Sequence, residues 1–242
     1  MTPRCGERAK AWCQLVVGGE FVLTDSSAAG MCKLTENSFR DVNIAFANEL
    51  SMICDKFGIN VWELVRLANR HPRVNILQPG PGVGGHCIAV DPWFIVDSAP
   101  REARLIRTAR EVNDYKPHAV IDQITEAAKH FKKPTIACFG LAFKANVDDL
   151  RESPALEITK HLAEKRIGTV LAVEPHVSTL PKGLEKATLV SAEEAMKRAD
   201  IMVILVDHKA FFTLDWKAAK QPIIDTRGIV SAPAVAAPAL KA

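Results

Sequence analysis

The sequence predicts an α/β protein in which a helical domain is followed by a Rossmann-like domain, a parallel sheet covered by helices. Between residues 26 and 58, apolar side chains recur every three or four positions without a proline, which is typical of one long helix. After Pro134, short apolar runs alternate with helix-like segments, which is typical of parallel strands. We place the domains at 1–115 and 116–231, and we expect the alanine- and proline-rich tail 232–242 to be disordered.

Helices are predicted for most of the first domain. The long helix has Gly58 as its expected C-terminal cap, and a shorter helix over VWELVRLANR (61–70) ends before a proline. The next segment, 71–94, is rich in glycine and proline and predicts a loop. A further helix begins near Pro100 and runs to about Phe131.

Strands and helices are predicted to alternate in the second domain. The apolar runs that indicate strands are TIACFGLAF (135–143), TVLAVEP (169–175), ATLVS (187–191), IMVILVD (201–207) and PIIDTRG (222–228). Helices are expected over 153–165 and 192–200. This alternation favours a parallel sheet with helices on its faces.

The bulk composition does not suggest a nucleic-acid or membrane partner. The chain has 242 residues, 48% of them hydrophobic, and a formal net charge of only +3, with its basic residues scattered. No apolar run approaches membrane-spanning length, and the start MTPRCGERAKAW has no signal-peptide core. We therefore expect a soluble cytoplasmic protein that binds neither nucleic acid nor membrane.

The six cysteines form no C-x-x-C pair, and the chain is long enough to fold without disulfides. We expect reduced thiols and no bound metal. Burial as a small apolar side chain suits Cys5, Cys13, Cys54 and Cys138.

The most informative segment is PGPGVGGHCIAVDP (79–92). Gly80, Gly82 and Gly85 satisfy the dinucleotide pattern G-x-G-x-x-G, which requires a strand before it and a helix directly after it. Prolines flank the first glycine, so that context is missing and we reject a dinucleotide site here. A tight loop whose backbone approaches a ligand closely is the better interpretation.

A thiol, Cys87, follows this loop, with His86 beside it and Asp91 four residues later. Nucleophilic cysteines act as thiolates and need partial access to solvent and a favourable charge environment. A lone thiol is equally compatible with a structural cysteine, so residue types alone leave both interpretations open.

Three motifs together resemble the UDP-glucose/GDP-mannose dehydrogenase family. They are PGPGVGGHCIAVDP, TENSFRDVNIAFANEL (35–50) and GLAFKANVDDLRESPALEI (140–158), and the resemblance runs from about residue 1 to residue 228. Members of the family oxidise the C6 alcohol of a nucleotide sugar twice, to a carboxylate, and reduce two NAD⁺. Val90 stands where UDP-glucose members carry lysine, which favours the N-acetylhexosamine branches. The run HPRVNILQPGPGVGGHC resembles the N-acetylmannosamine branch more than the N-acetylglucosamine branch.

The resemblance implies a covalent mechanism with four catalytic residues. Cys87 stands at the position of the nucleophile, which attacks the aldehyde and passes through a thiohemiacetal and a thioester. Asp91 matches the carboxylate that orients or activates the hydrolytic water. Lys33 and Asn37 match a lysine and an asparagine that would stabilise the alkoxide and the oxyanions, and their spacing puts both on one helix face.

The resemblance also implies binding residues and a homodimer. The substrate residues are Arg73, which in some relatives enters the neighbouring subunit's sugar site, Gly82, Gly84, Gly85, Phe143 and Lys144. Arg151 matches a cofactor residue. Glu174 imitates a ribose-binding acid, but the resemblance assigns its domain to the uridine nucleotide. The apolar face of the long helix from Ser38 to Ile53 is expected to form the homodimer.

The family's N-terminal domain, which holds NAD, is missing from this sequence. One hypothesis is therefore the C-terminal portion of an active dehydrogenase, and we expect this chain alone to produce no NADH. A second is an inactive module that binds nucleotide sugar or dimerises. A third, an unrelated hydrolase using Cys87 and His86, is disfavoured because adjacent side chains diverge and no third orienting group is evident.

Overall fold

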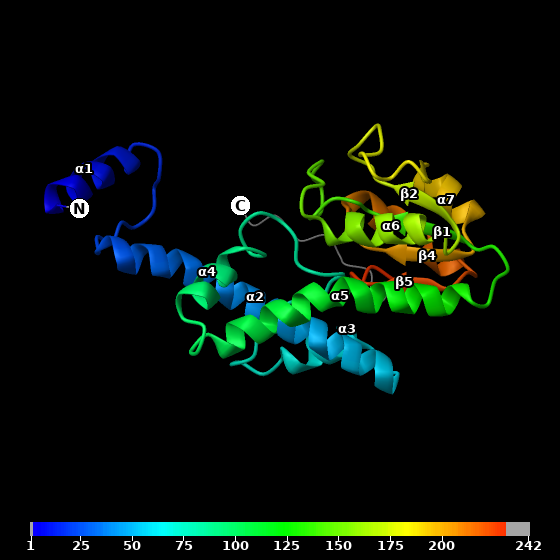
Figure 1. The fold of residues 1–242 in the computed structure, drawn as a ribbon, viewed down its shortest axis with the longest axis horizontal. Coiled ribbons are helices and arrows are strands. Elements are labelled where there is room, and N and C mark those ends of the chain that lie inside the picture. Colours follow the sequence, from blue (N-terminus) through cyan, green and yellow to red (C-terminus); the bar gives the residue numbers. More distant parts are fainter. Residues whose placement is uncertain (1, 231–242) are drawn as a thin grey trace.

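The computed structural model describes residues 2–230, and it consists of an extended helical part and a compact α/β part (Figure 1). The predicted tail 232–242 lies outside the described residues. The helical part contains α1 (Pro3–Cys13), α2 (Ser26–Phe57), α3 (Val61–Ala68), α4 (Asp91–Ser98) and the first half of α5 (Arg104–Ala128). Among the described residues, no helix is long and apolar enough to cross a membrane.

Helix α2 confirms the prediction of one long helix. Asp25 caps its start by accepting hydrogen bonds from the backbone N–H groups of Ser27 and Ala28. Gly58 ends the helix in the left-handed conformation, with φ of 65°, which glycine adopts without steric cost. Helix α2 packs chiefly on α5, and also on α3 and α4.

Helix α4 begins at Asp91, so the loop prediction for 71–94 was wrong over its last four residues. Pro92 falls in the first turn of α4, where the missing N–H of proline would have no partner in any case. The many glycines and prolines just before Asp91 indicated a loop, so the start of a helix was not predicted there. Helix α5 begins at Arg104 rather than near Pro100, and it continues through Pro117 in its interior.

The α/β part confirms the predicted strand and helix alternation. Its strands are β1 (Thr135–Phe139), β2 (Thr169–Val173), β3 (Ala187–Leu189), β4 (Ile201–Ile204) and β5 (Ile223–Asp225). All are parallel, in the order β3-β2-β1-β4-β5. The helices α6 (Pro154–Lys165) and α7 (Ala192–Arg198) match the two predicted ones. In such a sheet the connections diverge after β1 and β4, and ligands bind in the crevice at the carboxyl ends of those strands.

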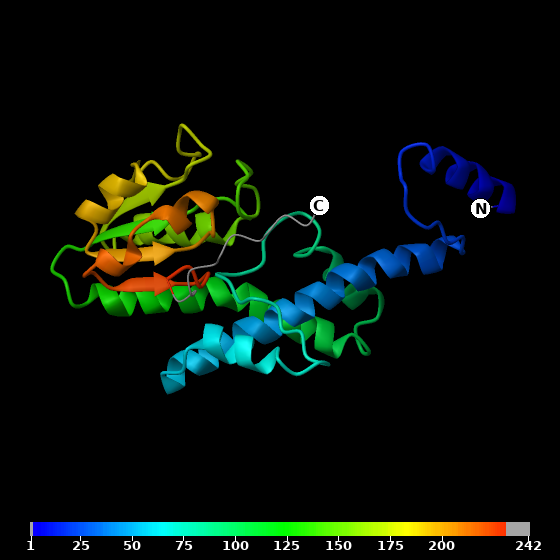
Figure 2. The same cartoon turned by 180° about the vertical axis from the view of Figure 1, so that it is seen from behind.

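Each face of the sheet buries an apolar core. On one face, α5 and α6 contribute side chains such as Ile124 and Ile158, both fully buried. On the other, α7 packs together with two short 3₁₀ helices, η1 (Lys209–Thr213) and η2 (Trp216–Ala218). Helix α5 therefore runs from its contact with α2 into the core of the sheet domain, and Figure 2 shows it (green) beneath the sheet and continuing among the other helices.

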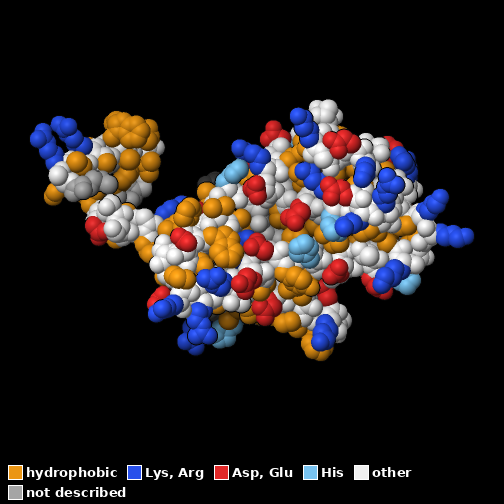
Figure 3. Space-filling view, in the orientation of Figure 1, with side chains coloured by type: hydrophobic (Ala, Val, Ile, Leu, Met, Phe, Trp, Pro, Cys, Tyr) orange, Lys and Arg blue, Asp and Glu red, His pale blue; other side chains and the backbone are white. Residues whose placement is uncertain are grey.

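The burial of the cysteines agrees only in part with the prediction. Cys54 and Cys138 are buried, and burial raises the pKa of the Cys138 thiol to about 12, so both are structural as expected. Cys13 is half-buried and Cys5 is exposed, so the predicted burial of Cys5 was wrong. The physical reason is that α1 has no buried residue. Figure 3 shows its hydrophobic side chains gathered on the surface of this N-terminal part.

Candidate functional site

The glycine loop between α3 and α4 lies directly against the α/β part. A Cβ atom on Gly84 would stand 2.3 Å from the carbonyl oxygen of Glu152 and 2.7 Å from Pro154. A Cβ on Gly82, whose φ is 148°, would stand 2.9 Å from Pro154 and 3.0 Å from Pro117. Real Cβ atoms do not approach so closely, so only glycine allows this contact. The close backbone approach predicted for the loop is therefore made, and it is made with the chain itself.

Gly85 and Phe143 continue this contact toward the cysteine. Gly85 has a φ of 89°, and a Cβ on it would stand 3.2 Å from the Phe143 ring. Its N–H donates to the Glu152 carbonyl over 3.3 Å. Phe143 follows β1, so the glycines connect the cysteine segment to the carboxyl edge of the sheet.

Two of the four predicted catalytic side chains, those of Asn37 and Asp91, meet at the start of α4, and Cys87 lies in the turn just before them. Cys87 is exposed, and its carbonyl oxygen accepts the N–H of Asp91 over 2.8 Å, in the turn that begins α4. The Asp91 Oδ2 atom accepts a hydrogen bond of 2.5 Å from Nδ2 of Asn37, which is only 4% exposed on α2. Asn37 on α2 therefore reaches the helical turn that follows Cys87, although it lies 50 or more positions earlier in the sequence.

Lys33, the fourth, lies one turn before Asn37 on α2. Its side chain is 63% exposed, and its Nζ lies 3.5 Å from a carboxylate oxygen of Glu36, which is equally exposed. Surface pairs of this kind contribute little to stability and do not fix a side chain. Lys33 lies one helical turn from Asn37. Among the described contacts, its side chain bonds to Glu36 and makes no hydrogen bond to Asp91 or Cys87.

A buried polar network, missed by the sequence analysis, holds the beginning of the glycine loop. Asn48 accepts the N–H of Gly80 over 2.8 Å and donates to Asn113 over 2.9 Å. Asn113 donates to Asp41 Oδ1 over 2.9 Å, and Arg110 donates to the same oxygen over 2.7 Å. Each of these four side chains is less than 5% exposed, so the network fixes α2, α5 and the loop to one another.

Burial raises the pKa of the Asp41 carboxyl above its ordinary value, although the charge of Arg110 opposes the shift. Asp41 Oδ2 and Arg110 Nε are also buried with no hydrogen-bond partner in the described structure.

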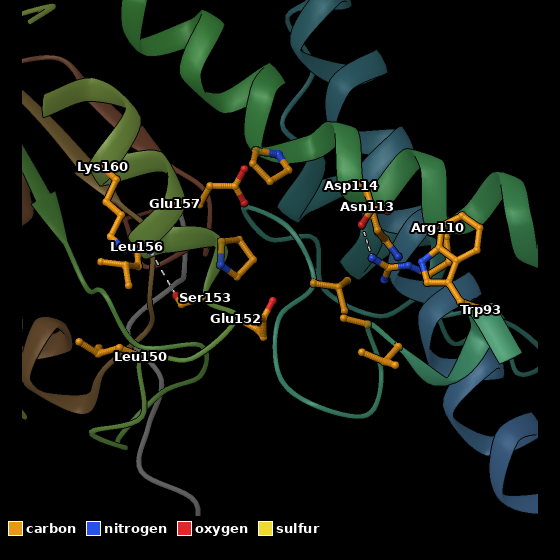
Figure 4. Close-up of a pocket in the computed structure, with 15 residues that line it drawn as sticks. Trp93, Arg110, Asn113, Asp114, Leu150, Glu152, Ser153, Leu156, Glu157 and Lys160 are labelled. Atoms are coloured by element: carbon orange, nitrogen blue, oxygen red, sulfur yellow. Dashed lines mark hydrogen bonds and ion pairs between the residues drawn. The ribbon is translucent and has the colours of Figure 1, made fainter. Parts of the chain in front are cut away.

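Arg110 lines a cavity of about 570 Å³ between the two parts of the protein. In Figure 4, Trp93, Arg110, Asn113 and Asp114 stand on one side of this cavity and Glu157 and Lys160 on the other. Among the described residues, Cys87 does not line it.

Arg227 is a second residue that the sequence analysis missed. It follows β5, and its Nε and Nη2 donate to Asp207 Oδ1 over 2.9 and 2.6 Å. It lines a small hollow of about 20 Å³ together with Phe143 and Lys144. A Cβ on Gly80 would stand 2.7 Å from its Nη1. The position after a parallel strand, the same rule that supported Lys144, would have revealed Arg227 and Asp207.

The remaining predicted binding residues are more loosely arranged. Lys144 is exposed, with its Nζ 5.3 Å from the centroid of the Phe143 ring. Arg151 is 71% exposed and makes a two-point ion pair of 2.8 and 2.7 Å with Asp149, whose pKa it holds far below the usual range. Arg73 is exposed after α3, and its backbone N–H donates to Nδ1 of His71 over 3.3 Å.

Glu174, at the end of β2, is turned inward. Its Oε2 accepts the N–H groups of Leu141 and Ala142 over 2.8 and 3.1 Å, and it faces Nε2 of His208 at 3.0 Å. Burial on its own raises the pKa of this carboxyl, but the hydrogen bonds from His208 and the backbone outweigh it and hold the pKa below its usual value. A carboxylate occupied in this way is not free to bind the ribose of NAD.

The same residues also form a group with metal-ligand chemistry. Ligand atoms of Glu174, His176 and His208 lie within 4.8 Å of one another. However, both ring nitrogens of His208 already take part in hydrogen bonds, one with Glu174 and the other with the N–H of Asn146. The arrangement is a satisfied hydrogen-bond network and not an open ligand set.

Comparison with known proteins agrees with this architecture. Residues 27–115 match the central domain of the UDP-glucose/GDP-mannose dehydrogenase family, and residues 137–232 match that family's UDP binding domain. The chain is 64% identical over 238 residues to an NDP-N-acetyl-D-galactosaminuronic acid dehydrogenase of Ralstonia solanacearum, covering 98% of this chain and 56% of that protein. It is 58% identical over 239 residues to a UDP-N-acetyl-D-mannosamine dehydrogenase of Escherichia coli (strain K12), covering 95% and 57%. The chain thus spans little more than half the length of these relatives.

Solved structures of the same kind share the fold. A UDP-N-acetyl-mannosamine dehydrogenase from S. aureus superimposes with a TM-score of 0.82 at 42% identity, over 96% of this chain and 55% of the other. A UDP-D-ManNAc dehydrogenase from Pyrococcus horikoshii gives a TM-score of 0.84 at 36% identity, over 96% and 56%. With both domain models matched in their order along the sequence, the chain belongs to the UDP-glucose/GDP-mannose dehydrogenase family.

Proposed function

We propose that this chain is the central and UDP-binding portion of an NAD-dependent dehydrogenase. In our proposal, the parent enzyme oxidises the C6 alcohol of a UDP-linked N-acetylhexosamine to a carboxylate. The observation that carries the proposal is the grouping of exposed Cys87 with Asp91 and Asn37, at a loop that packs on the carboxyl edge of the sheet. A reactive thiol, a carboxylate and an amide donor are the groups that aldehyde oxidation through a thioester requires.

In this proposal, Cys87 is the nucleophile. Its thiolate sulfur adds to the C6 aldehyde, and the aldehyde oxygen becomes the alkoxide of a thiohemiacetal. Oxidation at C6 turns this adduct into a thioester. Water then adds to the thioester carbon, the C–S bond breaks, and the carboxylate and the free thiolate are released.

Asp91 and Asn37 act as one unit in the hydrolytic step. The amide of Asn37 holds Asp91 Oδ2, so the other carboxylate oxygen stays available to orient water or accept its proton. Lys33, exposed and only weakly paired, is positioned to turn toward the oxyanion when substrate is bound. In the proposal, NAD would accept the two hydrides and would be held by another part of the parent enzyme.

The nucleotide is proposed to lie at the carboxyl ends of β1, β4 and β5. Phe143, Lys144 and Arg227 meet there beside the glycine loop, and two of them carry positive charge that suits a diphosphate. Arg73 is proposed to bind the sugar held by a neighbouring subunit. Arg151 is proposed to bind the cofactor. Arg151 would have to exchange Asp149 for that new partner.

The sugar is proposed to be N-acetylmannosamine, as in several of the relatives. N-acetylgalactosamine is the second candidate, because the relative with 64% identity is an N-acetyl-D-galactosaminuronic acid dehydrogenase. Assaying the parent enzyme for NADH with UDP-linked N-acetylmannosamine, N-acetylgalactosamine and N-acetylglucosamine discriminates among them. Activity with none of the three would contradict the proposed function and would favour an inactive binding or dimerisation module.

A homodimer through α2 is part of the proposal. Phe39, Phe46 and Ile53 are 67%, 51% and 43% exposed, although each is large and apolar. They are spaced seven residues apart and therefore share one helix face. A second copy of the chain packing on this face would remove all three from water.

A further inference from the structure

His208 lies fully buried just beyond the end of β4. Its ring stands edge-on to Phe211, with the centroids 5.3 Å apart and an interplanar angle of 88°. On one side, its Nε2 lies 3.0 Å from Glu174 Oε2, the oxygen that also accepts the N–H groups of Leu141 and Ala142. His208 therefore belongs to the network that holds the beginning of the loop after β1.

The opposite nitrogen of His208 holds the tip of the same loop. The N–H of Asn146 donates to His208 Nδ1 over 3.0 Å. A nitrogen that accepts a hydrogen bond carries no hydrogen, so Nε2 must be the protonated one and must donate to Glu174. The surroundings thus select a single neutral form of the imidazole, which accepts on one side and donates on the other.

Asn146 has a left-handed backbone conformation, with φ of 60°. Among residues other than glycine, asparagine adopts this conformation most readily. Its side chain accepts the N–H of Lys209 over 2.9 Å, while its own N–H is bound to His208. Both contacts come from the segment after β4, so the loop tip is held from outside the loop.

Phe143 and Lys144 lie between the two points at which the loop is held. The Phe143 N–H also donates to the Asp149 carbonyl over 3.1 Å, which closes the loop on itself. The Phe143 side chain packs on both glycines, with its Cβ against Gly84 and its ring against Gly85, so its position affects where the cysteine segment lies. Displacement of the loop tip would therefore affect the nucleotide edge and the glycine loop together.

We propose that His208 is a positioning residue for nucleotide binding: its imidazole, oriented by Glu174, fixes Asn146 and thereby places Phe143 and Lys144. The inference rests on the proposed function, because that proposal assigns this loop to the UDP-sugar. His208 itself contacts no nucleotide in this account. It acts through the backbone N–H of Asn146.

Two substitutions of nearly equal size separate the two hydrogen bonds. His208→Asn puts an amide oxygen near the place of Nδ1, so the Asn146 N–H keeps its acceptor. His208→Gln puts an amide nitrogen near the place of Nε2, so Glu174 keeps its donor and Asn146 loses its acceptor. Phe211→Leu is the control, because it disturbs the packing around the ring and leaves both hydrogen bonds intact.

The experiment measures the Kd for UDP by calorimetry, and the hydrogen exchange of the Asn146 amide by NMR, on the 242-residue chain. For His208→Gln we expect about tenfold weaker UDP binding and at least tenfold faster exchange, since one hydrogen bond of about 1.4 kcal/mol corresponds to a factor of ten. His208→Asn should stay within about threefold of wild type in both. Phe211→Leu should lower the melting temperature and leave the Kd within about twofold.

Equal Kd values for the Gln and Asn variants, or a Phe211→Leu variant that weakens UDP binding as much as His208→Gln, would overturn the proposal. If the histidine variants do not fold, the ring nitrogen chemical shifts of His208 in the wild-type chain provide the test. The proposal requires an unprotonated Nδ1 that accepts the Asn146 N–H and a protonated Nε2 that faces Glu174, and the opposite tautomer would overturn it. If wild type binds no UDP, the proposed function fails, and the exchange rates alone then decide whether His208 holds the loop.

Discussion

Replacing Asn48 with alanine tests the buried network that anchors the glycine loop. Asn48 is fully buried, and the substitution leaves the Gly80 N–H and the Asn113 side-chain oxygen without their partner. An unsatisfied buried group costs roughly 1–3 kcal/mol, so the pair should cost about 2–6 kcal/mol. At about 3 °C per kcal/mol for a chain of this size, that corresponds to a fall in melting temperature of roughly 6–18 °C.

The assay is thermal unfolding of wild type and variant under identical conditions. Gln123→Ala is a matched control, because Gln123 also joins α5 to α2 through its amide, with a hydrogen bond of 2.5 Å to Asp55 that is exposed to solvent. Water replaces that partner, so we expect the control to cost less than about 1 kcal/mol. An Asn48→Ala variant that melts within about 2 °C of wild type would refute the reasoning that this network holds the loop.

Three further predictions concern other parts of the protein. Phe46→Glu on α2 should convert the proposed dimer to a monomer in light scattering; a wild type that is already monomeric at micromolar concentration would refute the dimer. Arg227→Lys loses the forked contact with Asp207 and should weaken UDP binding about tenfold by calorimetry, and an unchanged Kd would exclude Arg227 from the nucleotide site. Because the folded pKa of Glu174 lies below its ordinary value of 4.5, its ionised form stabilises the protein above pH 4.5, and that contribution disappears as the pH falls through the lowered pKa. Glu174→Gln should therefore show a smaller loss of stability below pH 4.5 than wild type in denaturant titrations, and parallel curves would contradict this.

Local sequence patterns predicted most of the fold. Helix α2 is specified by its own apolar spacing, with Asp25 and Gly58 at its ends. Buried parallel strands are continuous apolar runs, so β1 to β5 were recognisable without knowledge of their neighbours. Helix α4 was missed because Pro92 and the glycines before it indicate a loop when they are interpreted without the packing of α4 on α2 and α5.

The site was predictable only where a motif marked it. The resemblance drew attention to Cys87, Asp91 and Asn37; in the structure the side chains of Asn37 and Asp91 meet, one helical turn after Cys87. The contacts of Asn48 with Gly80, and of His208 with Asn146, join residues that are 32 and 62 positions apart. No local pattern indicates such pairs, since buried hydrogen-bond partners are selected by the tertiary fold and not by spacing along the chain.

The central claim is that the Cys87 thiol forms the covalent intermediate. The most direct measurement is rapid quenching of the parent enzyme with a UDP-N-acetylhexosamine and NAD⁺, followed by mass spectrometry of the peptide that contains Cys87. We expect that peptide to carry the mass of the uronyl thioester, and we expect Cys87→Ser to lose both the adduct and acid formation. Cys5→Ser, at another exposed thiol, should behave as wild type. Normal acid formation by the Cys87→Ser enzyme would contradict the account.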